Sequence, residues 1–274
     1  MTEPMISVII PTLDCGDKLN DALDSFCSQT RCNFEIIIVD GGSSDGTIYF
    51  AQNHPISRKI SITIIKKFGS SIYGAMNAGA KLASGKWLLF FGADDQLYDS
   101  LVFADIFPLL ESSSEAVVYG EAFSQKLGGV RGGSAYDNYS LSRWTICHQA
   151  IFYRSHLFNE LSYSYDEKFP VEADWDLNLK LWARFKFRYT NRIICMSGDN
   201  GISSRFTHTP FLDVRDSRIL TYFGWKALSF LPPYRLKSAI ISNSAFVYLP
   251  FYYLLRLCDT VSSIMKKISP HPNP

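Results

Sequence analysis

The sequence predicts an α/β fold built on a mostly parallel β-sheet with helices on both faces. Two observations lead to this prediction. Short apolar runs rich in Ile and Val alternate with segments of helical periodicity, at the spacing of β-α-β units. In addition, no internal repeat or long linker divides the 274 residues, so the chain fits one large domain with an appendage.

The first third of the chain contains the clearest elements. Strands are expected in "ISVIIPT" (6–12), "FEIIIVD" (34–40), "KISITIIKKF" (59–68) and "KWLLFFGADD" (86–95). Helices are expected between them, at residues 17–30, 47–54 and 72–85. The first of these helices repeats apolar residues at helical spacing, namely Leu19, Ala22, Leu23 and Phe26. Because helical crossovers join parallel strands, these strands should lie parallel to one another.

The remaining elements are less regular. Residues 100–133 predict a helix, the strand "AVVYGEAFS" and a Gly-rich turn, and residues 144–154 predict an extended segment that carries His148. A loop at "FPVEADWD" leads into an amphipathic helix with Leu177, Leu181 and Phe185 on one stripe and Asp176 facing solvent. Residues 188–198 predict another strand, and residues 203–237 an irregular helical region.

Composition narrows the functional classes. Hydrophobic residues make up 47% of the chain and the mean hydropathy is near zero, as expected for a large core. A net charge of +1 argues against a nucleic-acid binder. The six cysteines form no C-x-x-C pair and lie in apolar surroundings, which suits reduced core residues of a cytosolic protein. The opening "MISVIIP" is too short for the apolar region of a secretory signal.

The C-terminal segment differs in charge from the rest. Residues 226–274 contain six basic residues and one acid, a net charge of +5, against −4 for residues 1–225. Residues 238–255 are uncharged and rich in Tyr and Phe, with basic residues on both sides. This pattern suits an interfacial membrane helix; a buried or dimer-forming helix, a membrane span and an ordinary basic tail are the alternatives.

Polar residues end three of the expected strands. Thr12, Asp40 and Asp94 all stand at carboxyl ends, where open α/β sheets bind ligands. The adjacent Asp94 and Asp95 are either solvated loop residues or ligands of a hard cation such as Mg²⁺ or Mn²⁺ beside a diphosphate. Asp40 suits hydrogen bonds from a ribose or a base, whereas Asp45 suits a helix cap or an Asx turn. The loop "GGSSDG" matches neither a dinucleotide fingerprint nor a P-loop.

Four motifs occur together in a characteristic order. These are "SVIIPT", "EIIIVDGGSSDGT", "IYGAMNAGAKLASGKWLLFFGADD" and "ADWDLNLKL". Between about Ile6 and Ser204 the chain resembles glycosyltransferase family 2, whose members use nucleotide sugars and have the Rossmann-like GT-A fold. It looks most like the bacterial branch that builds capsule, O-antigen or other surface polysaccharides.

The resemblance implies roles for individual residues. Pro11 and Thr12 would line the nucleotide pocket, Asp40 would bind the uracil or another base, and the helix with Met76 would face the ribose and sugar. The set implied for nucleotide-sugar binding is Pro11, Thr12, Asp40, Gly42, Met76, Asn77, Gly79, Asp94 and His148. The run "NGISS" (200–204) resembles a loop that closes over the donor diphosphate.

The resemblance also implies the chemistry. Asp94, with Asp95 beside it, would match the metal-binding acid of the family's D-x-D motif and hold Mn²⁺ or Mg²⁺. Asp174 would match the general base that deprotonates the acceptor hydroxyl, with Glu172 as the reserve candidate. A helix N-cap is the structural alternative for Asp174.

Other residues have weaker functional signals. A role in structure is the alternative for His148, and His208 could reach the metal or the diphosphate. Trp175 and Trp182 are expected in the core, although a tryptophan beside the base could stack on a sugar.

Three departures from the family pattern bear on the donor and the metal. Gly92 replaces the first acid of D-x-D, and Leu13-Asp14 replaces a common Tyr-Asn pair. An acid common before "IYGAMN" is absent, with Gly69 and Ser70 in its neighbourhood. The departures leave the donor and the need for metal open.

The sequence therefore predicts an inverting glycosyltransferase. Residues 1–225 would form the GT-A domain, and residues 226–274 a helical extension that contacts the membrane peripherally. The expected donor is a UDP-sugar and the expected acceptor a saccharide on undecaprenyl diphosphate, at the cytoplasmic face of the inner membrane. A catalytically silent, nucleotide-sugar-binding or partner-binding relative is the alternative. A nucleotidyltransferase is disfavoured because its Gly-rich phosphate loop is missing.

Overall fold

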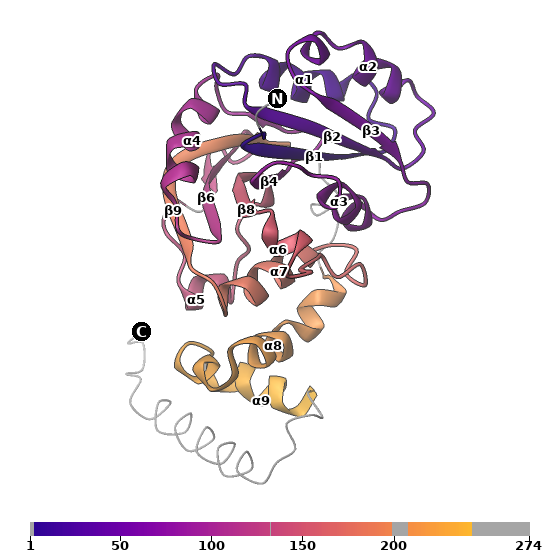
Figure 1. The fold of residues 1–274 in the computed structure, drawn as a ribbon. Coiled ribbons are helices and arrows are strands. Elements are labelled where there is room, and N and C mark those ends of the chain that lie inside the picture. Colours follow the sequence, from indigo (N-terminus) through magenta and orange to yellow (C-terminus); the bar gives the residue numbers. More distant parts are fainter. Residues whose placement is uncertain (1–2, 132, 199–207, 243–274) are drawn as a thin grey trace, which may run out of the picture.

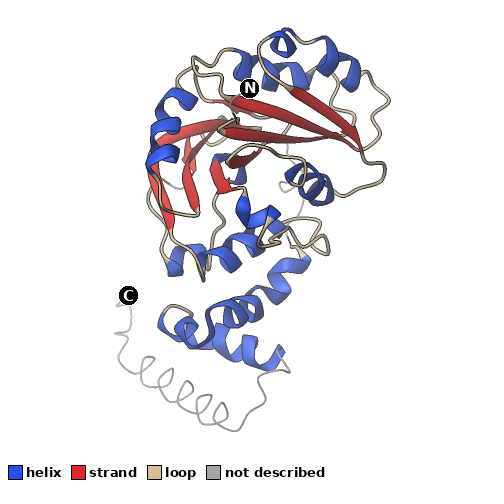
Figure 2. Cartoon of the chain, in the orientation of Figure 1, coloured by secondary structure: helices blue, strands red, loops and turns tan. Residues whose placement is uncertain are grey.

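The computed structural model describes residues 3–131, 133–198 and 208–242. Within them a single curved sheet carries helices on both faces, and two further helices pack below it (Figure 1). The strand order is β3-β2-β1-β4-β8-β6-β9-β5, and β7 pairs with β6 at the side. Figure 2 shows the sheet between helical layers, so the predicted α/β class is confirmed.

The N-terminal half of the sheet is parallel. It contains β1 (Ile6–Thr12), β2 (Phe34–Asp40), β3 (Ile62–Lys66) and β4 (Trp87–Phe90), which pair parallel through β2-β3, β1-β2 and β1-β4. Thr12 is in register with Asp40, so two of the three predicted strand-end residues are neighbours. The parallel prediction holds for this half.

Alternate residues of these strands face two separate cores. Val8, Ile10 and Ile38 pack toward α1 (Lys18–Cys27), α2 (Thr47–Asn53) and α4 (Val102–Ser112). Ile9 and Val39 pack toward α3 (Ile72–Ala80) on the opposite face. Helix α3 approaches β1 closely at Gly79, where a Cβ atom would lie 2.5 Å from Cγ2 of Ile9. A glycine is required there because no side chain fits.

The C-terminal half of the sheet is mixed. Its strands are β5 (Gln96–Leu97), β6 (Val117–Ser124), β7 (Gly129–Arg131), β8 (Ile151–Arg154) and β9 (Phe187–Ser197). Strand β8 pairs antiparallel with both β4 and β6, whereas β9 pairs parallel with β6 and antiparallel with β5. The expectation of a mostly parallel sheet fails here, because β8 follows the short helical turn η2 (His148–Ala150) and not a crossover helix.

Helix α7 (Ala173–Trp182) is more deeply buried than an amphipathic helix. Every residue from Ala173 to Leu179 is buried. Side chains of the sheet strands pack on one face of the helix, and α8 (Pro210–Phe223) packs on another. The prediction that Asp176 faces solvent was wrong, since it is 4% exposed and accepts a hydrogen bond from Tyr222 of α8 at 2.8 Å. Phe185 lies three residues beyond the end of the helix and packs against the same core.

Short elements complete the described chain: η1 (Pro55–Arg58), α5 (Asn138–Leu141), α6 (His156–Asn159), η4 (Gly224–Ser229) and α9 (Pro233–Ser242). Helix α9 packs against α8, and buried Arg235 of α9 pairs with Asp216 of α8 and donates to the Ser142 carbonyl at 2.9 Å. These contacts cross the predicted boundary at residue 226, and the division into 1–225 and 226–274 stays a prediction.

None of the helices in the described ranges is long and apolar enough to cross a membrane. The predicted diphosphate loop (200–204) and most of the uncharged segment 238–255 lie outside the described residues. The expectation that the cysteines are core residues holds for Cys195, which is buried, but is wrong for Cys32, which is exposed. The other described cysteines are half-buried, and Cys258 lies outside the described residues.

Candidate active site

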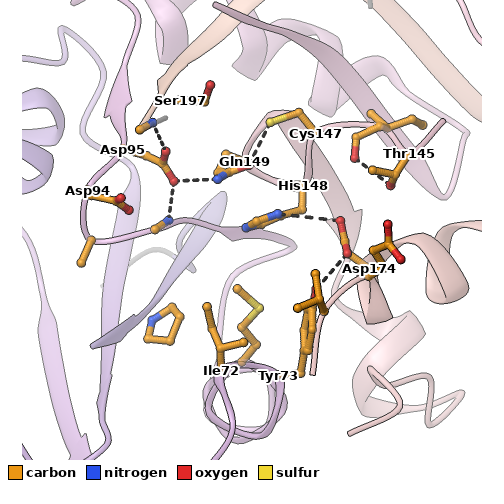
Figure 3. A pocket seen from close by; sticks show the side chains of 18 of the residues that line it. Ile72, Tyr73, Asp94, Asp95, Thr145, Cys147, His148, Gln149, Asp174 and Ser197 are labelled. Atoms are coloured by element: carbon orange, nitrogen blue, oxygen red, sulfur yellow. Dashed lines mark hydrogen bonds and ion pairs between the residues drawn. The ribbon is translucent and has the colours of Figure 1, made fainter. Parts of the chain in front are cut away.

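A cavity of about 700 Å³ opens where β1 and β4 end, and it extends to the middle of β6, at residues 119–121, and to Tyr189 and Ser197 of β9. Figure 3 shows its centre, where α3, the turn after β4, the segment 145–149 and the start of α7 meet. The predicted site residues that line it are Pro11, Thr12, Met76, Asp94, Asp95, His148 and Asp174. Five segments that are far apart in the sequence thus converge on one cavity. Asp40, Gly42, Asn77 and Gly79 lie outside its lining.

Asp174 stands in the first turn of α7, at the wall of the cavity. The Tyr73 hydroxyl donates to its Oδ1 at 2.9 Å, and Nδ1 of His148 lies 3.8 Å from its Oδ2 (Figure 3). The N-cap of α7 is Glu172, so Asp174 is not the cap. A carboxylate in this first turn is favoured by the helix N-terminus. Asp174 is 7% exposed and has one oxygen bonded to Tyr73.

Two groups beside Asp174 have perturbed acidities. Burial, and then the Asp174 charge, raises the pKa of Tyr73 well above its ordinary value, so the hydroxyl keeps its proton. Burial also raises the pKa of Glu172. Thr209 donates a hydrogen bond to Glu172 Oε2, so this reserve candidate is already engaged with the segment that precedes α8. The geometry favours Asp174 over Glu172 as the base.

Asp94 and Asp95 have different environments. Asp94 is exposed and lines the cavity. Asp95 is 1% exposed, and its carboxylate accepts hydrogen bonds from Gly92 N, Gln149 Nε2 and Gly198 N at 3.0, 2.8 and 2.8 Å. Burial raises the pKa of Asp95. Asp95 therefore joins three chain segments through its hydrogen bonds, and the prediction that it is a metal ligand stays a prediction.

Among the described residues, the fit to a divalent cation is a site with few protein ligands. No group of three or more His, Cys, Asp or Glu side chains with metal-binding geometry occurs in the described ranges. Mg²⁺ and similar cations often bind through one or two carboxylates and the phosphates of a substrate. Asp94 is a carboxylate exposed at the cavity, and its role as a metal ligand stays a prediction.

The comparisons with known proteins decide the family. Residues 7–166 match the model described as glycosyl transferase family 2. A relative from Mycobacterium tuberculosis (strain H37Ra), the "PGL/p-HBAD biosynthesis glycosyltransferase", is 36% identical over 217 residues, which cover 77% of this chain and 84% of the relative. The chain belongs to glycosyl transferase family 2. It is therefore a glycosyltransferase.

Solved structures support the GT-A fold of this family 2 member. S. aureus TarS 1–349 in complex with UDP-GlcNAc has a TM-score of 0.67 and 15% identity, over 92% of this chain and 79% of that chain. The mannosyltransferase PcManGT from Pyrobaculum calidifontis, in complex with GDP-Man and Mn²⁺, has a TM-score of 0.57 and 18% identity, over 96% and 81%. The family 2 chain spans 46% of a longer TarS structure. Identities this low show the fold alone.

The departure at position 92 has a structural explanation in this family 2 chain. A Cβ atom at Gly92 would lie 2.4 Å from Oδ2 of Asp95. The Asp95 carboxylate thus occupies the space that a side chain at position 92 needs, and the Gly92 N–H donates to it. Asp94 is exposed at the cavity, whereas the Asp95 carboxylate fills the space beside Gly92.

Asp40 holds the turn after β2. It is fully buried and accepts hydrogen bonds from Thr12 Oγ1, from the N–H groups of Gly42 and Ser43, and from Ser43 Oγ, at 2.5–3.2 Å. The carboxylate lies behind Thr12, which does line the cavity. Its contact with a base stays a prediction. Asp45 accepts from the N–H and hydroxyl of Thr47, as expected of an Asx turn.

Several other predicted residues have structural contacts in this arrangement. The Asn77 amide donates to the Tyr165 carbonyl and accepts from its N–H, and Gly42 has a φ of 112° under the Phe68 ring. His208 pairs with Asp213 in an exposed position. The indoles of Trp175 and Trp182 donate to backbone or amide oxygens near α5 and pack in the core.

Sequence reasoning missed Tyr73, Gln149 and a group of tyrosines. Tyr119, Tyr136 and Tyr189 line the end of the cavity at β6 and β9, and Tyr189 donates to Glu121. Tyr73 lies inside the quoted "IYGAMN" run and Gln149 directly follows His148. Both residues therefore lie in or next to segments that the sequence had already marked as functional. No local pattern distinguishes a tyrosine that lines a cavity from one in the core.

Proposed function

We propose that this glycosyltransferase transfers a sugar with inversion from a nucleotide sugar, most simply a UDP-sugar, to a saccharide hydroxyl. The proposal rests on one observation: an aspartate in the first turn of α7, Asp174, lies at the wall of the same cavity as Asp94 and Thr12. A single displacement needs one base near the acceptor hydroxyl and no enzyme nucleophile.

The reaction proceeds in one step. The acceptor oxygen attacks the anomeric carbon of the donor while its proton moves to the Asp174 carboxylate. The bond from the anomeric carbon to the diphosphate oxygen breaks, and its electron pair leaves with the nucleoside diphosphate. A base of this kind contributes about 10²- to 10⁴-fold in rate.

The donor is assigned to the end of the cavity at β1 and β4. Pro11 and Thr12 line this end and Asp94 is exposed there. We assign Mn²⁺ or Mg²⁺ to Asp94; a divalent ion there neutralises charge that develops on the leaving diphosphate. Complexes of the neighbours with UDP-GlcNAc and with GDP-Man and Mn²⁺ support this assignment by analogy.

The acceptor is assigned to the opposite end. Tyr136 and Tyr189 present aromatic surface there, and both pack against Tyr119, which is 2% exposed. The three hydroxyls are engaged with a backbone N–H, a backbone carbonyl and Glu121. Aromatic rings with few free polar groups suit a sugar ring. A saccharide on a lipid diphosphate at the cytoplasmic membrane face remains our proposal, with the basic segment 226–274 as the peripheral membrane contact.

The experiment compares Asp174→Asn with Asp176→Asn. Both change a buried aspartate of α7, but Asp176 does not line the cavity. Release of nucleoside diphosphate from UDP-glucose, UDP-galactose, UDP-GlcNAc and GDP-mannose is measured with Mn²⁺. We expect Asp174→Asn to lose about 10²- to 10⁴-fold and Asp176→Asn to stay within a few-fold of the wild type.

A catalytically silent, nucleotide-sugar-binding or partner-binding relative is the alternative, and the absence of an acid at position 92 favours it. The same experiment separates the two. Equal rates of release for the wild type and Asp174→Asn, with UDP still bound, would establish the silent alternative.

A further inference from the structure

Tyr73 is held rigidly beside the proposed base. It is the second residue of α3, whose N-cap Ser71 accepts from the Gly74 N–H. Its ring is 6% exposed and packs against Tyr165, with the ring centroids 5.1 Å apart. Helix α3 is itself fixed by the close approach of Gly79 to β1. The Tyr73 hydroxyl therefore points from a rigid support to Asp174.

The two oxygens of Asp174 have different partners. Oδ1 accepts the Tyr73 hydroxyl at 2.9 Å. Oδ2 lies 3.8 Å from Nδ1 of His148, which is longer than a hydrogen bond. The side chains of Asp174 and His148 are 9% and 23% exposed, so this pair borders the cavity. Oδ2 consequently keeps lone pairs for an incoming proton, whereas Oδ1 is engaged.

We propose that Tyr73 is a positioning residue, whose hydroxyl fixes the Asp174 carboxylate so that Oδ2 takes the acceptor proton. The inference rests on the proposed function of Asp174 and adds which oxygen reacts and what orients it. His148 then lies beside the reacting oxygen, on the cavity side, where the acceptor hydroxyl arrives.

Tyr73 is one of several titratable groups around the Asp174 carboxylate. The other groups near Asp174 are His148 from η2, Glu172 from α7, and Tyr153 and Tyr165. Burial raises the pKa of Tyr153 and of Tyr165 well above the ordinary range, so both stay neutral.

The test is Tyr73→Phe, with Tyr163→Phe as the matched control. Tyr163 is also buried and its hydroxyl accepts a hydrogen bond from Arg184 Nη1 at 3.2 Å, but it does not line the cavity. The Asp174 carboxyl carbon is followed by ¹³C NMR at one neutral pH, with the signal assigned by its loss in Asp174→Asn. We expect its chemical shift to move in Tyr73→Phe, because the hydrogen bond to Oδ1 is lost, and to stay at the wild-type value in Tyr163→Phe.

Turnover provides the second readout. With the nucleotide sugar that the wild type uses, kcat of Tyr73→Phe should fall about tenfold, less than for loss of the base, with the donor KM unchanged. An unchanged carboxyl chemical shift in Tyr73→Phe, or a moved chemical shift with an unchanged kcat, would overturn the inference. If the wild type releases no nucleoside diphosphate, the proposed function fails, and the carboxyl chemical shift still decides whether Tyr73 contacts the carboxylate.

Discussion

Asp94 and Asp95 are chemically identical neighbours that differ in what surrounds them. Asp94 is exposed at the cavity, whereas Asp95 is 1% exposed and accepts three hydrogen bonds. A hard cation needs a carboxylate that is free to turn toward it and toward a diphosphate. At the scale of single residues, exposure and hydrogen bonding thus separate Asp94, the proposed metal ligand, from Asp95, which holds chain segments together.

This difference predicts opposite effects for two adjacent substitutions. Asp94→Asn should leave the melting temperature unchanged without ligand and should lose the extra stabilisation that Mn²⁺ adds to UDP, which follows the ligand-linked relation. Asp95→Asn should destabilise the free protein by about 1–3 kcal/mol, because an amide N–H then faces buried N–H donors. Thermal-shift titrations of both variants with UDP, with and without Mn²⁺, check this. Equal melting temperatures for the two free variants would contradict it.

At the scale of elements, α7 and α8 are joined by a buried acid. Asp176 accepts from the Tyr222 hydroxyl at 2.8 Å, and Nε of Arg218 lies 3.9 Å from its Oδ1. Burial raises the pKa of Asp176 despite the opposing effect of Arg218. The folded state therefore binds this proton more tightly than the unfolded state does. Its contribution to stability is present at low pH and is lost as the pH rises through the folded-state pKa.

Asp176→Asn should remove that pH dependence. We expect the stability of the wild type, relative to the variant, to decline as the pH rises from about 4 toward 7. Melting temperatures of both proteins at matched ionic strength measure the difference. Glu172 and Asp95 also have raised pKa values and remain in the variant, so their contributions cancel in the comparison. A relative stability that increases over this range would refute the assignment.

Some features of these elements could be predicted from the sequence, and others could not. Strands β1 and β2 have the predicted bounds, because an apolar run that stops at Thr12 or Asp40 determines both the strand and its end. The convergence of Asp94 and Asp174 on one cavity followed from the family resemblance. The direction of β8 and the burial of Asp176 were not predictable, because both depend on partners distant in the chain. The same holds for Tyr73, whose role comes from a contact 101 residues away.

At the scale of the whole molecule, the two helices below the sheet connect the cavity to the C-terminal segment. Arg235 of α9 is 7% exposed, pairs with Asp216 of α8, and donates to the carbonyl of Ser142, three residues before Thr145 at the cavity wall. Trp225 and Tyr234, in η4 and α9, are 59% and 70% exposed. Exposed aromatic residues next to a basic segment are typical of proteins that bind at a membrane interface.

The basic residues beyond Ser242 provide the test of membrane contact. Arg256, Lys266 and Lys267 outnumber the one acid there, Asp259, and none of the three belongs to α8 or α9. The full chain should pellet with vesicles that contain phosphatidylglycerol, and replacement of these three residues by alanine should reduce pelleting by several-fold, since each basic residue near an anionic surface is worth about 1 kcal/mol. Raised salt should also weaken wild-type binding, because it screens the attraction.

Lys81→Ala, at an exposed position after α3, is the control for loss of a positive charge alone. Equal pelleting of the wild type and the triple variant, at low and high salt, would exclude an electrostatic membrane contact through this segment and would leave the exposed aromatic pair of η4 and α9 as the surface to examine.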